Sequence, residues 1–371
     1  MVSIVLAGGG TAGHTSPLIA TAEALMRLQP EARITCIGTH KGLETHVIPQ
    51  AGLDLRLVDP VPMPRRVNLD LFRLPLRVAT AVYQAQQILK EVRADIVVGF
   101  GGYVSVPAYL AAYLSKIPVI VHEQNALPGI ANKMAARFAQ VVATTFADTA
   151  LPKAHLVGMP LRTSITDLAH GVDEAKKIAA EKIFGLRHDM PTLLVSGGSQ
   201  GARSINTAIY EAIPAICAAG IQILHVWGSK NYPETISEYV DENTGAIYRP
   251  WRYVDRMEEA YAVCDLMVAR SGAGTVAETA TIGLPTILVP LAVGNGEQAK
   301  NGAGAVKAGA AVMIDDADLN ASSLSEHVCA LMKDPQRLKS MSDAGRQLFS
   351  SGAADELAEI TMRYATLGER R

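Results

Sequence analysis

A short apolar segment, a cluster of glycines and then a helical pattern follow one another twice in this chain. The first copy reads MVSIVLAGGGTAGHTSP from residue 1, and the second reads LLVSGGSQGARS from residue 193. A strand that passes through a glycine turn into a helix is the first part of a βαβ unit. Because such a unit is completed by a parallel strand, two copies predict two parallel α/β sheets.

Strand and helix patterns alternate along the rest of the chain. Helices are expected at 17–28 and 106–114, and continuous Val- and Ile-rich segments predict strands that are buried on both faces. The predicted strands are 3–7, 33–38, 96–99, 119–121 and 141–144, then 222–226, 246–248, 266–269, 286–289 and 311–314.

The series pauses near Leu161–Asp167 and restarts after a charged helix. The fold class is therefore predicted as α/β, with two tandem Rossmann-like doubly wound parallel-sheet domains. We expect domains at 1–163 and 164–345, and a last helix within 346–371 that packs back on the first domain. A length of 371 residues agrees with two domains.

Composition excludes several classes of protein. Hydrophobic residues make up 49% and charged residues 19%, which is unlike a disordered chain. The net charge of -2, from 34 basic and 36 acidic residues, lacks the basic excess of a nucleic-acid binder. No targeting segment or membrane span is expected. The four cysteines, which form no CxxC pair, are predicted to be reduced, buried thiols in a cytosolic protein.

The first glycine loop, Gly8–Gly13, satisfies GxGxxG between a strand and a helix. The free N–H groups of the helix N-terminus suit a phosphate. A nicotinamide dinucleotide would also need an acidic residue after the second strand to hold the ribose. That strand runs into Thr39-His40-Lys41, and Glu44 is a poor substitute, so this loop does not favour such a cofactor.

Two glycine loops occur in the second half. The loop Gly197–Gly201 lacks the GK[ST] ending of an ATP-binding P-loop. The other, ARSGAGTVAETA, places Arg270, Ser271 and Gly272 at a loop tip and Glu278 one turn into a helix. A carboxylate there can accept hydrogen bonds from ribose hydroxyls. Tight packing would explain one such loop, whereas two favour a nucleotide diphosphate in this half.

A fourth loop, GFGGYVSVP, precedes the strand VIVHEQNALPG in the first half. His122, Glu123, Gln124 and Asn125 follow that strand and are expected beside the first loop. Polar side chains at a strand end are a usual ligand position. For Glu123, a satisfied hydrogen-bond network around a turn is the preferred interpretation.

The segments AGGGTAGHTSP, GFGGYVSVP, HEQNALPG, VGMPLR, SGGSQGAR, RSGAGTVAE and EQAKNG occur here in one order. Together they closely resemble the MurG family of peptidoglycan N-acetylglucosaminyltransferases, over nearly the whole chain. The resemblance implies the GT-B arrangement of two Rossmann-like domains facing a cleft. It implies inverting transfer of GlcNAc from UDP-GlcNAc to the C4 hydroxyl of MurNAc in lipid I, which gives lipid II and UDP. It also implies a peripheral location on the anionic cytoplasmic face of the plasma membrane, beside other cell-wall synthesis proteins.

The resemblance further implies roles for individual residues. The donor would bind mainly to the second domain and the lipid acceptor to the first, without a cofactor or a metal. Residues expected to contact UDP-GlcNAc are Thr11, Ala12, Gly13, Asn125, Arg162, Ser199, Val254, Ala273, Gly274, Thr275, Val276, Ala277, Glu278 and Gln298. Departures from the family pattern are Ala12, Met159 and Glu297.

His14 is the predicted general base for the acceptor hydroxyl. Its ordinary pKa near 6.5 leaves it largely neutral, and a helix N-terminus disfavours its protonated form. A cap or phosphate-donor role is the alternative for His14, and His122 and Glu123 are the alternative bases. The string Asp316-Ala317-Asp318 matches a metal-binding DxD, but we interpret it as a solvated cap far from the glycine loops.

The segment PMPRRVNLDLFRLPLRVATAVY interleaves basic and apolar residues. Such a surface can lie on an anionic membrane, with Arg65, Arg66, Leu71, Phe72 and Leu74 as the expected contacts. A loop and helix that cover the core are the alternative.

Three other functions remain open from the sequence. They are a UDP-GlcNAc epimerase, a nicotinamide-dependent oxidoreductase and a nucleotide-sugar binder without activity. The sequence leaves undetermined the oligomeric state, the domain closure, the peptide of the acceptor and the identity of the base.

Overall fold

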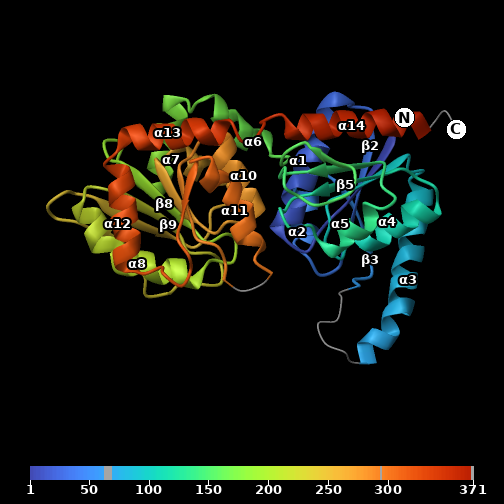
Figure 1. Cartoon of the computed structure of the whole chain (residues 1–371), viewed down its shortest axis with the longest axis horizontal. Helices are drawn as coiled ribbons and strands as arrows, with labels where there is room; N and C mark the ends of the chain where they lie inside the picture. The colour runs from blue at the N-terminus through green and yellow to red at the C-terminus, as the bar shows by residue number, and fades with distance from the viewer. Residues whose placement is uncertain (62–68, 293–294, 369–371) are drawn as a thin grey trace. The chain divides into compact units, whose positions relative to one another are not determined.

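The computed structural model describes residues 1–61, 69–292 and 295–368, and it divides into two compact units (Figure 1). Unit 1 comprises Met1–Arg162 and Ser351–Arg371, and unit 2 comprises Thr163–Ser350. The division between Arg162 and Thr163 falls within Leu161–Asp167, where the sequence pattern pauses.

Unit 1 contains one fully parallel sheet with the strand order β3-β2-β1-β4-β5-β6-β7. The strand order reverses between β1 and β4, which makes this pair the topological switch point of the sheet. The strands are β1 (Ser3–Ala7), β2 (Arg33–Thr39), β3 (Asp54–Val58), β4 (Ile96–Gly99), β5 (Val119–Glu123), β6 (Val141–Thr144) and β7 (Ala154–Leu156).

Helices cover both faces of this sheet, as the continuous apolar strands require. Ile4 and Leu6 of β1 join one core cluster, while Val5 and Ala7 join the other, because alternate side chains point to opposite faces. The helices are α1 (Ala12–Leu28), α2 (Glu44–Gln50), α3 (Leu69–Glu91), α4 (Ser105–Leu114), α5 (Ile130–Ala135) and α14 (Ala353–Gly368).

The C-terminal helix α14 belongs to unit 1 and packs beside α1 (Figure 1). Its residues Leu357 and Ala358 are fully buried in the same cluster as Leu18 and Leu25 of α1. The last helix of the core of unit 1 therefore follows the whole of unit 2 in the sequence.

Unit 2 has a second sheet of the order β10-β11-β9-β8-β12-β13-β14, in which β10 alone is antiparallel. Its switch point lies between β8 and β12. The strands are β8 (Thr192–Ser196), β9 (Gln222–Val226), β10 (Tyr239–Val240), β11 (Ile247–Trp251), β12 (Leu266–Ala269), β13 (Thr286–Leu288) and β14 (Ala311–Met313).

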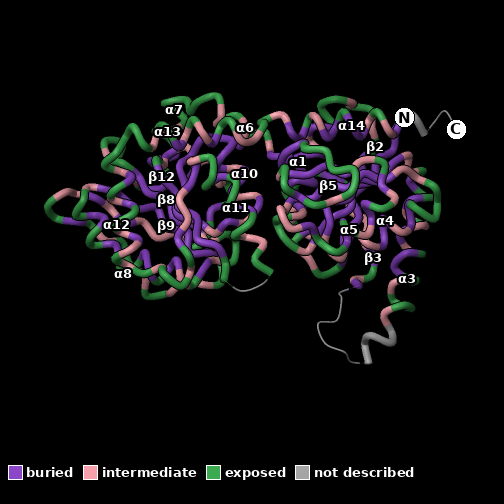
Figure 2. Tube along the Cα trace, in the orientation of Figure 1, coloured by how far each residue is buried: buried purple, intermediate pink, exposed green. Residues whose placement is uncertain are grey.

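The helices of unit 2 surround a second buried core. They are α6 (Thr163–Thr166), α7 (Glu174–Phe184), α8 (Arg203–Ala218), α9 (Met257–Ala262), α10 (Ala273–Ile282), α11 (Glu297–Lys307), α12 (Ala321–Met332) and α13 (Pro335–Arg346), with a 3-10 turn η1 (Asp167–His170). Figure 2 shows buried strands in each unit and exposed outer faces on the helices.

The structure corrects several sequence predictions. The strands β3, β7 and β10 were not predicted, and β11 begins one residue later than expected and runs on to Trp251. Cys36 and Cys217 are buried thiols, whereas Cys264 and Cys329 are only half-buried. Within the described residues, no helix has the length and apolar character needed to cross a bilayer.

Candidate functional site

The glycine loops of both units leave the sheets at the switch points. In unit 1, the loops after β1 and β4 are adjacent because Ala7 pairs with Gly99. In unit 2, the loops after β8 and β12 are adjacent because Ser196 pairs with Ala269. Ligands of open α/β sheets bind outside the carboxyl ends of the strands at this position.

The helices that follow three of these loops begin without a side-chain cap. Thr11 precedes α1, Ala202 precedes α8 and Gly272 precedes α10, and none of these residues accepts a capping hydrogen bond through its side chain. The first N–H groups of a helix have no partner within the helix. These three helix N-termini are therefore suited to anionic ligand groups.

His14 lies in the first turn of α1, behind the exposed residues Thr11, Ala12 and Gly13. Its Nδ1 is 2.9 Å from Thr11 Oγ1. Burial lowers the pKa of His14, and the negative charge of Glu44 acts in the opposite direction. The imidazole is consequently neutral near pH 7, as a general base must be.

Glu44 has a position that sequence reasoning missed. Its side chain is fully buried under the first glycine loop, where Oε2 accepts a hydrogen bond of 2.7 Å from Gly10 N–H. A carboxylate used in this way cannot also hold a ribose. The signal in the sequence was an acidic residue set among Gly9, Gly38 and Gly42, which leave room for it.

His122 and Glu123 are buried and engaged in structural hydrogen bonds. His122 Nε2 lies 2.8 Å from Gly158 O, and burial lowers the pKa of His122 to about 4. Glu123 accepts hydrogen bonds of 2.9 Å from Asn125 N, Gly129 N and Asn132 Nδ2, and burial raises its pKa. This geometry favours the turn-network interpretation of Glu123 and gives His122 the same kind of role.

Asn125 is half-buried at the end of this network, after β5. Arg162 is half-buried and is the last residue of unit 1 before the division. Both residues thus belong to the unit that carries His14.

In unit 2, Ser199 is exposed at the tip of the loop after β8. The carbonyl oxygen of Ser199 accepts hydrogen bonds from Ser229 N at 3.2 Å and from Ser229 Oγ at 3.1 Å. Val254 is largely buried, with 8% of its surface exposed. Gln298 is the second residue of α11, and its side chain accepts a hydrogen bond from Leu291 N.

Helix α10 carries six of the predicted donor residues. Ala273, Val276 and Ala277 are buried, whereas Gly274, Thr275 and Glu278 are half-buried. The carboxylate of Glu278 accepts a hydrogen bond of 2.7 Å from Tyr261 Oη of α9. Tyr261 is a second residue that the sequence gave no reason to select.

The interpretation of Asp316 as a solvated cap far from the glycine loops was wrong. Asp316 Oδ1 lies 2.5 Å from Arg270 Nη1 and accepts a hydrogen bond from Ser204 Oγ at 2.6 Å. Arg270 also donates to the carbonyl oxygens of Val289 and Pro290. Because β12 and β14 both end at this edge of the sheet, residues far apart in sequence meet there, and the guanidinium of Arg270 is engaged in these contacts.

The predicted membrane contacts are only partly described. Arg65 and Arg66 lie outside the described residues, as do the side chains of Leu71 and Phe72, although these two residues belong to α3. Leu74 is half-buried. Further along α3, Leu76 is 73% exposed and Tyr83 is 62% exposed.

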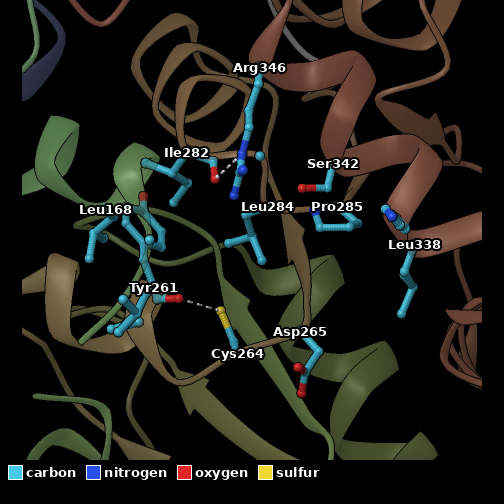
Figure 3. A pocket seen from close by; sticks show the side chains of 15 residues that line it. Leu168, Tyr261, Cys264, Asp265, Ile282, Leu284, Pro285, Leu338, Ser342 and Arg346 are labelled. Atoms are coloured by element: carbon cyan, nitrogen blue, oxygen red, sulfur yellow. Dashed lines mark hydrogen bonds between the residues drawn. The ribbon is translucent and has the colours of Figure 1, made fainter. Parts of the chain in front are cut away.

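A cavity of about 320 Å³ lies in unit 2 at the opposite edge of the sheet (Figure 3). It is bordered by Cys264 and Asp265 before β12, by Pro285 before β13 and by Arg346 of α13. None of the predicted donor residues lines it. In the described part of the chain, no group of three or more His, Cys, Asp or Glu side chains is arranged to hold a metal ion.

Comparison with known proteins covers both units. Residues 4–144 match the glycosyltransferase family 28 N-terminal domain, and residues 192–357 match the family 28 C-terminal domain. A UDP-N-acetylglucosamine--N-acetylmuramyl-(pentapeptide) pyrophosphoryl-undecaprenol N-acetylglucosamine transferase of Cutibacterium acnes is 56% identical, over 99% of this chain and 98% of that protein. The protein of the same name from a Nocardioides species is 47% identical, over 97% of both chains.

A solved structure is similar to this chain over nearly its whole length. The crystal structure of Acinetobacter baumannii MurG superposes with a TM-score of 0.74 at 25% identity, covering 98% of this chain and 100% of that one. The likeness therefore extends through both sheets and the connection between them.

Proposed function

The chain belongs to glycosyltransferase family 28, and from this premise we propose how its residues divide the work of transfer. The protein transfers N-acetylglucosamine from UDP-N-acetylglucosamine to N-acetylmuramyl-(pentapeptide) pyrophosphoryl-undecaprenol, which converts lipid I to lipid II. The observation that carries this conclusion is high identity, along nearly the whole chain, to a transferase of that name.

We propose that unit 2 binds the donor nucleotide. The uncapped N-terminus of α10 and the loop after β8 lie together at the switch point and offer N–H groups to the diphosphate. Glu278 then accepts hydrogen bonds from the ribose, and the main chain of Val254 contacts the uracil. Ser199 of this unit, together with Arg162 of unit 1, stabilises the charge that builds up on the leaving UDP, as preorganised donors do. Gln298 holds the hydroxyl groups of the sugar.

We propose that unit 1 presents the acceptor and that His14 removes the proton from its C4 hydroxyl. In the tautomer proposed here, His14 Nδ1–H donates to Thr11 Oγ1. Nε2 then carries the free lone pair and takes the proton. The oxygen then attacks the anomeric carbon while the bond to UDP breaks on the opposite face, so the configuration inverts. Asn125, beside the buried Glu123 network, orients the sugar that is transferred.

The test is transfer of labelled GlcNAc to lipid I, measured as labelled lipid II, with UDP release in parallel. Incubation without lipid I controls for epimerisation of the donor, and epimerisation there would contradict the proposal. His14→Ala should reduce turnover by roughly 10²- to 10⁴-fold. His327→Ala is the matched control, because this exposed histidine lies on α12 of unit 2 and should keep its turnover.

We further propose that α3 brings the protein to the membrane. Leu76 and Tyr83 are seven residues apart and lie on one side of the helix, well exposed. Leu76→Glu and Tyr83→Glu should reduce co-sedimentation with vesicles that contain anionic phospholipid. Ile183→Glu, which replaces a similarly exposed apolar side chain of unit 2, is the control. Equal loss of vesicle binding in all three variants would contradict a specific role for α3.

A further inference from the structure

The first glycine loop of unit 1 rests on a buried carboxylate. Glu44 is the first residue of α2, and its side chain has no exposed surface. Its Oε2 accepts a hydrogen bond from Gly10 N–H at 2.7 Å, while its Oε1 accepts from Thr39 N at 3.1 Å and Thr39 Oγ1 at 2.9 Å. All three partners donate, which suits a carboxylate because it only accepts.

The surrounding glycines leave space for this carboxylate because they have no side chains. A Cβ atom on Gly9 would lie 2.6 Å from Glu44 Cδ, and one on Gly42 would lie 1.8 Å from Glu44 Oε2. Gly10 adopts a φ of +88°, which aims its N–H at Oε2 and which side chains disfavour. Part of the glycine cluster therefore makes room for Glu44 and not only for a ligand.

The same loop carries the proposed base. Gly10 is followed by Thr11, whose carbonyl oxygen accepts hydrogen bonds from His14 N and Thr15 N and whose Oγ1 contacts His14 Nδ1. The hydrogen bond from Gly10 to Glu44 thus holds the segment that orients the imidazole. The negative charge of Glu44 also raises the pKa of His14, against the effect of burial.

Among the described residues, two elements besides α1 act on the imidazole or lie beside it. One is α2, which contributes the charge of Glu44. The other is the loop after β4, where a Cβ on Gly102 would lie 3.7 Å from the ring of His14. Its neighbouring titratable group is Tyr103, whose ring lies near Gly10.

We infer that Glu44 is a positioning residue for the transfer reaction: it fixes the loop that aims His14 and stabilises the imidazolium that forms when His14 takes the acceptor proton. The inference rests on the proposed role of His14. Glu44 does not touch the substrate, and it acts through the loop backbone and through its charge.

Glu44→Gln is the main test, because it removes the charge and keeps the shape. We expect turnover to fall by about 10- to 100-fold, as for a small displacement of a catalytic group. Binding of UDP to unit 2, measured by calorimetry, should be unchanged. In a His14→Ala background, Glu44→Gln should have little further effect, because residues that act through one another are not additive.

The pKa of His14, followed by NMR titration of the imidazole, gives a readout that does not depend on activity. It should be lower in Glu44→Gln than in the wild type, and the acidic limb of the turnover profile should move to lower pH with it. Thr39→Val is the matched variant, since it removes a hydrogen bond to the same carboxylate but keeps the charge. It should leave the pKa of His14 close to the wild-type value.

Glu44→Asp covers the case in which Glu44→Gln does not fold. It keeps the charge but withdraws the carboxylate from Gly10, so turnover should fall. A folded Glu44→Gln with the wild-type turnover and the wild-type His14 pKa would overturn the inference, and so would an equal loss of turnover with and without His14. Failure of the wild-type protein to make lipid II would instead count against the proposed function.

Discussion

The hydrogen bond between Tyr261 and Glu278 gives a direct test of how unit 2 holds its donor. Tyr261 Oη lies 2.7 Å from Glu278 Oε2, and Tyr261 is 6% exposed. Tyr261→Phe removes only this hydroxyl group. Glu278 then keeps its charge but loses a hydrogen-bond donor that directs its carboxylate toward the proposed ribose position.

The magnitude follows from the burial of the two partners. A hydrogen bond to a charged group contributes about 1.5–3 kcal/mol when no solvent replaces it. Glu278 is only half-buried, so water replaces part of the interaction. We expect donor binding to weaken by about 1 kcal/mol, which is roughly a fivefold rise in the donor KM. Turnover should change little, because a ribose contact binds the ground state and the transition state alike.

The assay is the dependence of lipid II formation on UDP-GlcNAc concentration, together with calorimetric binding of UDP. Tyr239→Phe is the matched control, because it also removes a tyrosine hydroxyl group of unit 2, next to the carboxylate of Asp241 and outside the proposed site. A loss of turnover at unchanged donor KM in Tyr261→Phe would refute the assignment of Glu278 to the ribose.

The carboxylates of Glu278 and Asp316 and the buried side chains of His122 and His225 can be tested in the same protein. Glu278→Ala should raise the donor KM more than it lowers turnover, and a pure turnover defect in steady-state kinetics would contradict its ribose role. Asp316→Ala leaves the Arg270 guanidinium, which is 12% exposed, without its carboxylate. It should destabilise unit 2 by about 1–3 kcal/mol in urea unfolding, and an unchanged midpoint would show that the pair is dispensable. Burial lowers the pKa of His122 to about 4 and that of His225 to about 3. Because the unfolded chain takes up these protons below about pH 6.5, stability is retained above that pH and lost below it. The loss is roughly 2 kcal/mol per histidine at pH 5. Urea unfolding at pH 7.5 and pH 5 measures this loss, and equal stabilities would disprove it.

Local sequence patterns were sufficient for most of the two sheets. β1, β4, β6 and β12 have the predicted bounds, because each is a mainly apolar segment that must be buried on both faces. β9 also has the predicted bounds, although it includes the polar residues Gln222 and His225. The strands that were not predicted, β3, β7 and β10, lie at the edges of the sheets. β3 alternates apolar residues with Asp54 and Arg56, and β10 is short and antiparallel. Such strands bury less surface and leave a weaker apolar pattern.

Some features of the candidate site were also predictable from local sequence, whereas others were not. The sequence by itself determined the glycine loops, the helices that start behind them and the resemblance that assigns roles to His14 and Glu278. These features are local, since a strand, a turn and a helix N-terminus are encoded within about a dozen residues.

Only the tertiary structure decided which side chains meet. Glu44 reaches Gly10, and Asp316 reaches Arg270, across gaps of 34 and 46 residues. His122 and Glu123 are committed to buried hydrogen bonds. These outcomes depend on the order of strands in each sheet, which brings distant loops to one edge. Strand order is set by the packing of the whole core, and no short segment of the chain contains it.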